Sequence, residues 1–238
     1  GKAIALMATH PGHLFEYEDG LKGARSITSQ VPHMIAVPTT AGTGSEVGGS
    51  TVISCPQTGR KVIIWSPHLI PPQVLADPQL TVDLPHFATA TTGIDALSHN
   101  MEAFLAKGYH PICDAIALEG IKLIHKSLHK AVSNPHDLEA RGDMLMASMM
   151  GAIAFQKGLG VTHSCAHALS ACFNLHHGLA NALMLGACMT FNQETVGDRL
   201  DQIARHIQLE NSQKLISWIK GLPVELGLPS CLSQLDVQ

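Results

Sequence analysis

Residues 159–183 read LGVTHSCAHALSACFNLHHGLANAL, and three histidines in this stretch fall at spacings that bear on both fold and chemistry. His163 and His167 are four residues apart, so on a helix their side chains project from one face. His177 follows ten residues after His167, directly before Gly178, where a new helix is expected to start. The apolar residues around them recur every three or four positions, which is typical of amphipathic helices. The stretch therefore predicts helices that carry several imidazole groups.

The same helical spacing extends from about Pro85 to near the end of the chain, with Pro, Gly and Asn at the joins. It predicts helices over residues 86–106, 111–132, 138–156, 163–174, 179–192, 198–206 and 212–222. We therefore expect residues 86–238 to form an all-α domain.

Residues 1–85 show a mixed α/β pattern instead. Residues 2–8 (KAIALMA) read as the end of a helix already in progress, which suggests that the chain has been cut from something longer. The apolar run 33–38 (HMIAVP) ends in proline and predicts a buried parallel strand. Further short strands are expected over residues 51–54, 61–65 and 74–76, the first two separated by the turn PQTG. The predicted architecture is thus an α/β part followed by a helical part.

The composition narrows the classes of function. The chain has 238 residues, 45% of them hydrophobic and 14% charged, with a formal net charge of -4, which fits a protein with a substantial core. It has no Lys/Arg-rich run, which argues against a nucleic-acid partner, and no apolar stretch of roughly 18 residues that would span a membrane. The six scattered cysteines are typical of reduced thiols in a cytoplasmic protein. Histidine, at 15 residues, is the unusual count.

A second pair of candidate ligands lies in residues 93–99, GIDALSH, where Asp95 and His99 are also four residues apart. A carboxylate supplies charge and neutral imidazoles supply nitrogen donors, which together suit a borderline divalent metal. One such pair arises by chance in any helical protein, and a lone histidine on an apolar face is usually a core residue. Two pairs and His177 favour a metal site, but the spacing leaves a zinc hydrolase, an iron oxygenase and a metal-binding protein all open.

The small-residue loop 39–45 (TTAGTGS) follows the predicted strand 33–38. Gly42 and Gly44 would let backbone N–H groups approach a phosphate, and Thr39, Thr40 and Thr43 offer hydroxyl donors. Taken alone, the segment reads more simply as a small-residue turn.

Three stretches together resemble signature segments of the iron-containing (group III) alcohol dehydrogenases, in that family's order. They are PTTAGTGSEV (38–47), GIDALSHNMEA (93–103) and the stretch 159–183. The resemblance implies a dehydroquinate synthase-like fold, in which a dinucleotide-binding α/β domain precedes a helical metal-binding domain. Here these would be residues 1–85 and 86–238, with both ends of the family's chain missing.

The resemblance also implies roles for individual residues. The metal, Fe(II) with zinc possible, would be held by Asp95, His99, His163 and His177. His167 would not be a ligand but would lie near the nicotinamide, in the proton path. Phe155 matches a substrate-facing aromatic residue. Contacts with NAD or NADP fall on Thr39, Thr40, Gly42, Thr43, Lys61, Leu80 and Thr81.

The function implied is reversible hydride transfer between a small alcohol or aldehyde and NAD(P), in a cytoplasmic enzyme that is a homodimer when full length. Short primary alcohols, diols and hydroxy acids are all open as substrates. The alternatives are a zinc-dependent, glycerol dehydrogenase-like enzyme and an inactive metal-binding helical module. A lyase of the dehydroquinate synthase type is disfavoured, because a Glu would be expected in its metal set. Since the chain lacks half of the family's dinucleotide site, we expect it to bind cofactor poorly by itself.

Overall fold

A computed structural model of the chain describes residues 1–235. The last three residues of the predicted helical domain, 236–238, lie outside the described part. The chain forms two compact units. The α/β unit comprises Gly1–Pro38 and Ser45–Ala76, and the helical unit comprises Thr39–Gly44 and Asp77–Gln238. The expected join at residues 85/86 therefore differs from the observed division. Residues 77–85 and the loop 39–44 pack with the helices rather than with the strands.

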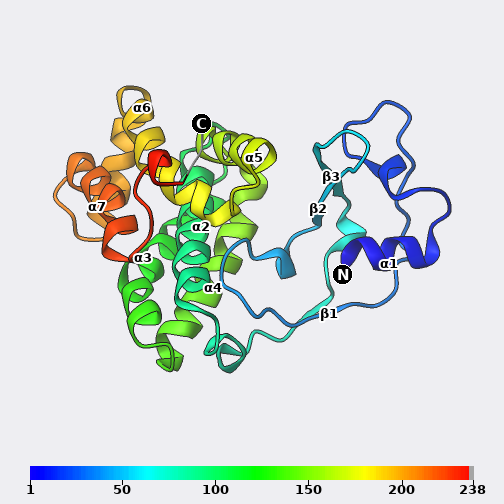
Figure 1. Ribbon diagram of the computed structural model, residues 1–238, viewed down its shortest axis with the longest axis horizontal. Helices are drawn as coiled ribbons and strands as arrows, with labels where there is room; N and C mark the ends of the chain where they lie inside the picture. Colours follow the sequence, from blue (N-terminus) through cyan, green and yellow to red (C-terminus); the bar gives the residue numbers. More distant parts are fainter. Residues whose placement is uncertain (236–238) are drawn as a thin grey trace. The chain divides into compact units, whose positions relative to one another are not determined.

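The α/β unit contains one helix, two pairs of strands and short 3-10 turns among its described residues (Figure 1). Its elements are α1 (Lys2–Thr9), η1 (Leu14–Tyr17), β1 (Ile35–Ala36), η2 (Ser45–Val47), β2 (Ser50–Ser54), β3 (Lys61–Trp65), η3 (Pro67–Leu69) and β4 (Gln73–Val74). β2 and β3 pair antiparallel across the PQTG turn, which confirms the predicted hairpin. β1 pairs parallel with β4, as expected of an α/β segment.

One part of the β1 prediction was wrong. The apolar run 33–38 predicted a buried strand, but Ile35 is 55% exposed and the strand has only two residues. The pair β1–β4 forms a two-stranded sheet of its own, separate from β2–β3, so no neighbouring strand covers it within the described residues. Parallel orientation could be read from sequence, whereas burial depends on what packs on the strand.

The core of the α/β unit is small and follows the strand period of two. Val62 and Ile64 on β3 are buried, while Ile63 and Trp65, which alternate with them along the strand, are exposed. These inward side chains pack in one cluster with Leu6, Tyr17 and Leu69.

Lys2 at the start of α1 is buried and fixes the helix to the segment that precedes β2. Its Nζ donates to the carbonyl oxygens of Ser45 (2.5 Å), Gly48 (2.7 Å) and Ser50 (3.0 Å). Burial lowers the pKa of Lys2 to about 8, although Glu46 nearby opposes this shift. A buried ammonium is tolerated here because several carbonyl oxygens accept from it.

The helical unit begins with the turn η4 (Pro78–Thr81) and contains six α-helices among its described residues. They are α2 (His86–Leu105), α3 (Pro111–Ser133), α4 (Leu138–Ala154), α5 (Val161–Phe173), α6 (His177–His206) and α7 (Ser212–Glu225), with the short turns η5 (Phe155–Lys157) and η6 (Leu232–Gln234). All lie close to the predicted ranges. The two helices expected over 179–192 and 198–206 form one helix, α6, with a kink at Val196. The predicted fold class is confirmed.

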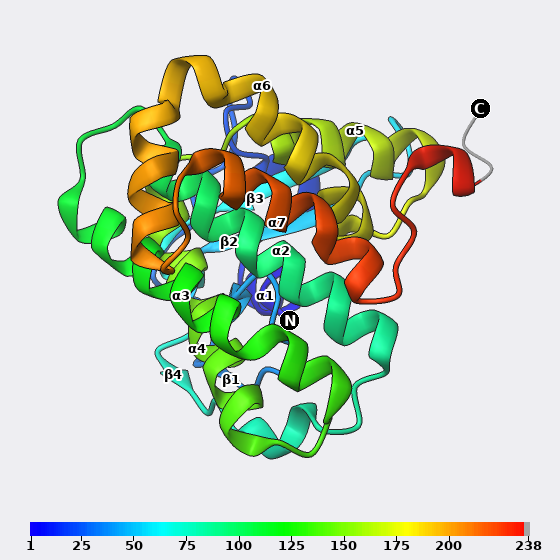
Figure 2. The ribbon, with the colours of Figure 1, turned by 90° about the vertical axis from the view of Figure 1, so that its left-hand side faces the viewer.

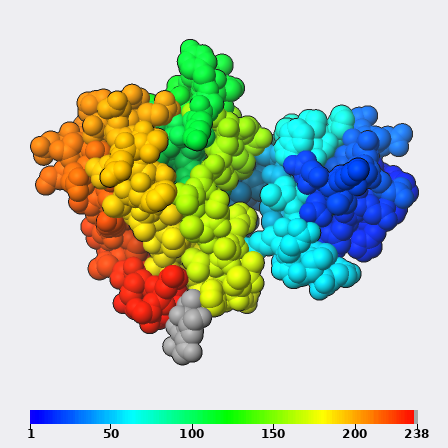
Figure 3. All heavy atoms as spheres, turned by 90° about the horizontal axis from the view of Figure 1, so that it is seen from above, coloured from blue at the N-terminus to red at the C-terminus, as the bar shows by residue number. Residues whose placement is uncertain are grey.

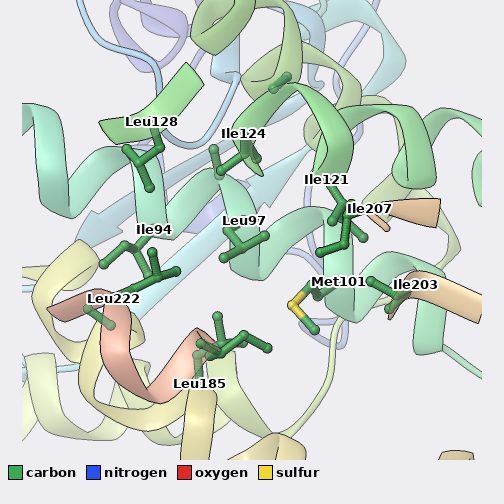
Figure 4. Packing of buried hydrophobic residues seen from close by; sticks show 14 of the residues in the cluster. Ile94, Leu97, Met101, Ile121, Ile124, Leu128, Leu185, Ile203, Ile207 and Leu222 are labelled. Atoms are coloured by element: carbon green, nitrogen blue, oxygen red, sulfur yellow. The ribbon is translucent and has the colours of Figure 1, made fainter. Parts of the chain in front are cut away.

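α2 is the central helix of this unit and contacts α3, α4 and α6 (Figure 2). Fifteen of its 20 residues are buried, so it is covered on nearly every side. Figure 4 shows Ile94, Leu97 and Met101 of α2 packed among side chains of α3, α6 and α7. Burial of such side chains contributes about 1.5–3 kcal/mol each, which makes α2 a rigid support for any polar group that it carries.

α6 and α7 pack against each other and form one side of the helical unit, coloured yellow to orange in Figure 3. In the described part of the chain, no single helix is both long and apolar enough to cross a membrane. One pair, Leu138–Lys157 with Val161–Phe173, meets the length and composition criteria but is bent by 105°.

Candidate metal centre

Two of the predicted ligands, Asp95 and His99, lie one turn apart on α2 and are both buried. The Nδ1 atom of His99 is 2.8 Å from the backbone carbonyl oxygen of Asp95. A carbonyl oxygen can only accept, so this nitrogen carries the proton and Nε2 is left with a free lone pair. The helix thus fixes both the position of the ring and its tautomer.

His163 reaches the same place from the first turn of α5. Its Nδ1 is 2.7 Å from Oε2 of Glu102, which lies one turn beyond His99 on α2. A carboxylate also only accepts, so the proton of His163 is on Nδ1 as well. The Nε2 atoms of His99 and His163 face each other at 3.0 Å.

Two imidazole nitrogens that face each other with lone pairs repel unless a proton or a cation lies between them. One donor atom each of Asp95, His99 and His163 lies within 4.8 Å of the others. This set consists of a carboxylate and two imidazoles, which is chemistry that divalent transition metals accept. The geometry of these residues therefore fits a metal ion.

His177, the first residue of α6, lies beside this donor set. Its Nε2 atom is 3.5 Å from Oδ1 of Asp95, and its ring centre is 5.7 Å from that of His163. α6 can come this close to α2 because residue 178 is glycine: a Cβ atom there would lie 2.5 Å from the carbonyl oxygen of Thr91. The Nδ1 atom of His177 is buried and has no hydrogen-bond partner in the described part of the chain.

Asn181, one turn after His177 on α6, is fully buried beside the same carboxylate. Its Nδ2 atom donates to Oδ1 of Asp95 at 2.6 Å and lies 3.2 Å from Nε2 of His177. The hydroxyl of Thr43 donates to the other oxygen, Oδ2 of Asp95, at 3.3 Å. Both oxygens of Asp95 are therefore oriented by neutral donors.

Burial sets the protonation of these groups. It lowers the pKa of His99 to about 4, although Asp95 opposes the shift. It also lowers the pKa of His177 to about 4, again against Asp95. Burial would raise the pKa of Asp95, but His99, His177, His163 and the hydrogen bond from Asn181 hold it below its usual value. At neutral pH His99 and His177 are thus neutral imidazoles beside the ionised carboxylate of Asp95.

The other predicted residues of this site lie around the cluster. His167 is one turn after His163 on α5, with its ring centre 5.1 Å from that of His177 and 6.4 Å from that of His163. Phe155 in η5 lies beside His99, and the centres of the two rings are 5.1 Å apart. His176, which was not a predicted site residue, lies against Phe87 instead, at 5.5 Å between ring centres.

The loop 39–44 is part of the helical unit, and its glycines serve packing there. Gly42 and Gly44 are buried. The carbonyl oxygen of Gly42 accepts from Oγ of Ser148 at 2.9 Å. Gly44 has φ +66°, and a Cβ atom there would collide with the carbonyl oxygen of Ser148 and lie 2.7 Å from Cβ of Ala152. The sequence suggested that these glycines open the backbone to a phosphate. Close packing explains them independently, because Gly44 lies against α4 and a Cβ atom at Gly42 would lie 3.1 Å from Cβ of Thr92 on α2.

Gly44→Ala is therefore expected to destabilise the helical unit by about 2–4 kcal/mol, since it combines a strained backbone with overpacking. The matched control is Gly227→Ala, which has almost the same φ of +65° but only an ordinary contact of 3.6 Å with His86. The control should lose only the backbone part, about 1 kcal/mol. The midpoints of urea unfolding of the two variants measure the difference, and equal midpoints would show that the loop does not pack as described.

The remaining predicted cofactor contacts are divided between the units. Thr39 and Thr40 are exposed in the loop of the helical unit, and the side chain of Leu80 is 47% exposed. Thr81 is buried, and its hydroxyl donates to the carbonyl oxygen of Pro78 at 2.8 Å, so its side chain faces inward. Lys61 is the first residue of β3, in the α/β unit.

Two residues that form hydrogen bonds with the cluster, Glu102 and Asn181, were not singled out in the sequence. Each had a signal: Glu102 is a lone acid in the apolar run 101–104, three residues after His99, and Asn181 is four residues after His177. Polar residues at helical spacing from candidate ligands are the pattern that would have found them.

Two family models match the chain. The C-terminal model of the Fe-containing alcohol dehydrogenase family matches residues 89–238, and the model described as iron-containing alcohol dehydrogenase matches residues 1–78. The first of these alone covers more than half of the chain.

Individual relatives agree with this match. The chain is 40% identical to the 4-hydroxybutyrate dehydrogenase of Cupriavidus necator, over 99% of this chain and 64% of the relative. It is 38% identical to the NAD-dependent methanol dehydrogenase of Bacillus methanolicus, over 100% of this chain and 64% of the relative. The solved structure of a sulfoacetaldehyde reductase from Bifidobacterium kashiwanohense in complex with NAD+ is similar over 100% of this chain and 62% of that one, with a TM-score of 0.91 and 33% identity.

The chain thus spans a little less than two thirds of the length of these relatives. The family models cover both units, and the relatives match along nearly the whole chain. The chain belongs to the iron-containing alcohol dehydrogenase family.

Proposed function

We propose that the protein to which this chain belongs is a metal-dependent alcohol dehydrogenase, which transfers hydride reversibly between a small alcohol or aldehyde and NAD or NADP. The observation that carries the proposal is the pair of Nε2 atoms of His99 and His163, which face each other at 3.0 Å beside the carboxylate of Asp95. Buried lone pairs in this arrangement are stabilised by a cation.

The metal would be held by Asp95, His99, His163 and His177. The first three already form one donor set, and His177 lies next to it with Nε2 directed at Asp95. Imidazole and carboxylate donors accept both iron and zinc. Membership of the iron-containing family favours Fe(II), and zinc is the alternative.

A metal held by Asp95, His99, His163 and His177 would supply Lewis acidity toward the substrate oxygen, and a bound nicotinamide would supply the hydride acceptor. The residues of this chain hold and shield the reacting groups. Asn181 and Thr43 orient the carboxylate of Asp95 through hydrogen bonds. Phe155 lies against the ring of His99, where an aromatic side chain excludes water and faces an apolar part of the substrate.

His167 is the residue to which we assign proton transfer with the substrate hydroxyl. It shares a face of α5 with His163, and its ring centre lies 5.1 Å from that of His177. An imidazole at this distance is near the site without being part of the donor set, and an imidazole can accept and release a proton.

For the nucleotide, we propose contacts with Thr39, Thr40, Gly42 and Thr43 in the loop, with Leu80 and Thr81, and with Lys61 of the α/β unit. The exposed hydroxyls of Thr39 and Thr40 support this. The inward-facing side chain of Thr81 leaves its backbone as the contacting part. We also propose that the α/β unit belongs to a dinucleotide-binding domain, and that the enzyme is a cytoplasmic homodimer.

The test uses the full-length protein, stripped of metal with a chelator and then supplied with Fe(II) or Zn(II) under anaerobic conditions. We expect NAD(P)-linked oxidation of short primary alcohols to vanish on stripping and to return with metal. The metal at about 100 times its Kd should also stabilise the fold by about 2.7 kcal/mol. Metal binding without turnover of any alcohol, diol or hydroxy acid would support the inactive module instead. Turnover in the fully stripped protein would contradict the proposal.

A further inference from the structure

Glu102 is a buried carboxylate whose hydrogen bonds all go to the start of α5. It is 3% exposed and lies on α2, one turn beyond His99. Its Oε1 accepts from the backbone N–H of Thr162 at 2.7 Å. Its Oε2 accepts from the backbone N–H of His163 at 3.2 Å and from Nδ1 of the same residue at 2.7 Å.

These bonds give Glu102 a structural effect on α5. The first N–H groups of a helix have no partner within the helix, and a negative charge there is favoured by the helix dipole. α5 has no side-chain cap of its own, because its N-cap residue is Gly160. The carboxylate of Glu102, which lies on α2, caps the N-terminus of α5 instead. Gly160 also makes room for it, since a Cβ atom there would lie 2.8 Å from Oε1 of Glu102.

The third bond gives Glu102 an effect on chemistry. An ionised carboxylate holds the proton of the His163 imidazole on Nδ1, which leaves Nε2 as the atom that can bind a metal. With the proton on Nε2, His163 would present a hydrogen instead of a lone pair to His99. The bond therefore selects the tautomer that is competent for binding.

Two other roles for Glu102 fit less well. As a metal ligand it would have to lie near Nε2 of His163, but it contacts Nδ1, on the other side of the ring, and it is outside the donor set of Asp95, His99 and His163. As a general acid it would need a raised pKa. Burial alone would raise the pKa of Glu102, but the hydrogen bond and charge of His163, together with the hydrogen bonds from Gly160 and Thr162, hold it below its usual value.

We propose that Glu102 is a positioning residue, which both caps α5 and fixes the Nδ1–H tautomer of His163 so that Nε2 is presented to the metal. This inference rests on the proposed function, because it assumes that His163 is a ligand. The inference goes beyond the proposed function, because it assigns part of the metal affinity of the site to a residue that does not touch the metal.

The decisive variant is Glu102→Gln in the full-length protein, which keeps the shape but places an amide donor opposite one of the donors of α5. The Kd for Zn(II) is expected to rise about 10- to 100-fold. The matched control is Glu119→Gln, a half-buried acid on α3 that pairs with Lys122 and His206 and should leave the Kd unchanged. Gly160→Ala, which presses on Oε1 of Glu102 without removing its charge, should shift the Kd in the same direction by less.

Two readouts separate positioning from a general loss of stability. In the metal-free protein, the ¹⁵N shifts of the His163 ring should show the proton on Nδ1 in the native chain and at least partly on Nε2 in Glu102→Gln. In a double-mutant cycle, Glu102→Gln should add almost nothing to the metal affinity already lost in His163→Ala, because it acts through that ring. Additive losses, or an unchanged tautomer with an unchanged Kd, would overturn the inference.

The outcome can be told apart from failure of the proposed function. If the native protein binds no metal, the proposed function fails first. If the native protein binds metal and Glu102→Gln binds it as tightly, only the role of Glu102 is wrong. If Glu102→Gln does not fold, Gly160→Ala is compared with the native protein instead. The ¹⁵N shifts of the His163 ring and the double-mutant cycle with His163→Ala then decide whether Glu102 positions that ring.

Discussion

Replacing His163 by alanine is expected to lower the affinity for a divalent metal by about 10²- to 10³-fold. Four-ligand sites bind their metal with about 10–16 kcal/mol, so one ligand accounts for about 2.5–4 kcal/mol. The loss should be near the upper end here, because His163 is 3% exposed and its Nε2 is only 3.0 Å from that of His99.

The measurement is a competition titration of Zn(II) or Fe(II) against a chelator of known affinity, with circular dichroism to confirm that the helices are retained. The matched control is His176→Ala, since this exposed histidine adjoins His177 but contacts Phe87. It should bind metal like the native protein. Equal loss of affinity in both variants would indicate general damage to this region rather than removal of a ligand.

Replacing His167 by alanine is expected to have the opposite pattern: metal content stays near native, while kcat falls by about 10²- to 10⁴-fold. The side chain lies one turn from His163, outside the donor set, and next to His177. Removal of a proton acceptor slows the step in which the hydroxyl proton leaves, without weakening the metal site.

Metal stoichiometry and the pH dependence of kcat, both on the full-length protein, test this division of roles. The pH–rate profile of the His167 variant should differ from that of the native protein, because a group of the proton path has been removed. Metal loss as large as that of His163→Ala would instead make His167 a ligand. Native turnover would remove it from the proton path.

Much of the fold could be predicted because it depends on local pattern. The helices of the helical unit show apolar spacing over many residues, and the hairpin β2–β3 has alternating residues around a clear turn. The grouping of Asp95 with His99 also follows from spacing, since residues four apart share a helix face. These features need no knowledge of what packs against them.

The rest depends on contacts between distant segments. The approach of α6 to α2, which brings His177 to Asp95, requires glycine at residue 178 against the backbone of Thr91. The two chemical partners of the cluster that the sequence did not single out, Glu102 and Asn181, act across helices on His163 and Asp95. Such pairings join residues 61 and 86 positions apart, and no periodicity within one helix predicts them.

The packing of the loop 39–44 shows a similar limit. A run of small residues predicts a turn and permits a phosphate contact, and both interpretations use only the local backbone. In the structure, Gly44 is required by the surface of α4, and Thr43 donates to the carboxylate of Asp95. One segment therefore supports the helical unit and the metal centre together, which explains why it groups with the helices and not with the strands that flank it.

The most direct test of the metal centre is anomalous X-ray scattering from a crystal of the metal-loaded protein, recorded on both sides of the iron and zinc absorption edges. The account predicts a single strong peak within about 2.0–2.2 Å of donor atoms of Asp95, His99, His163 and His177, and its edge identifies the metal. A fully loaded protein whose anomalous peak lies elsewhere, with Nε2 of His99 and of His163 still facing each other, would contradict it.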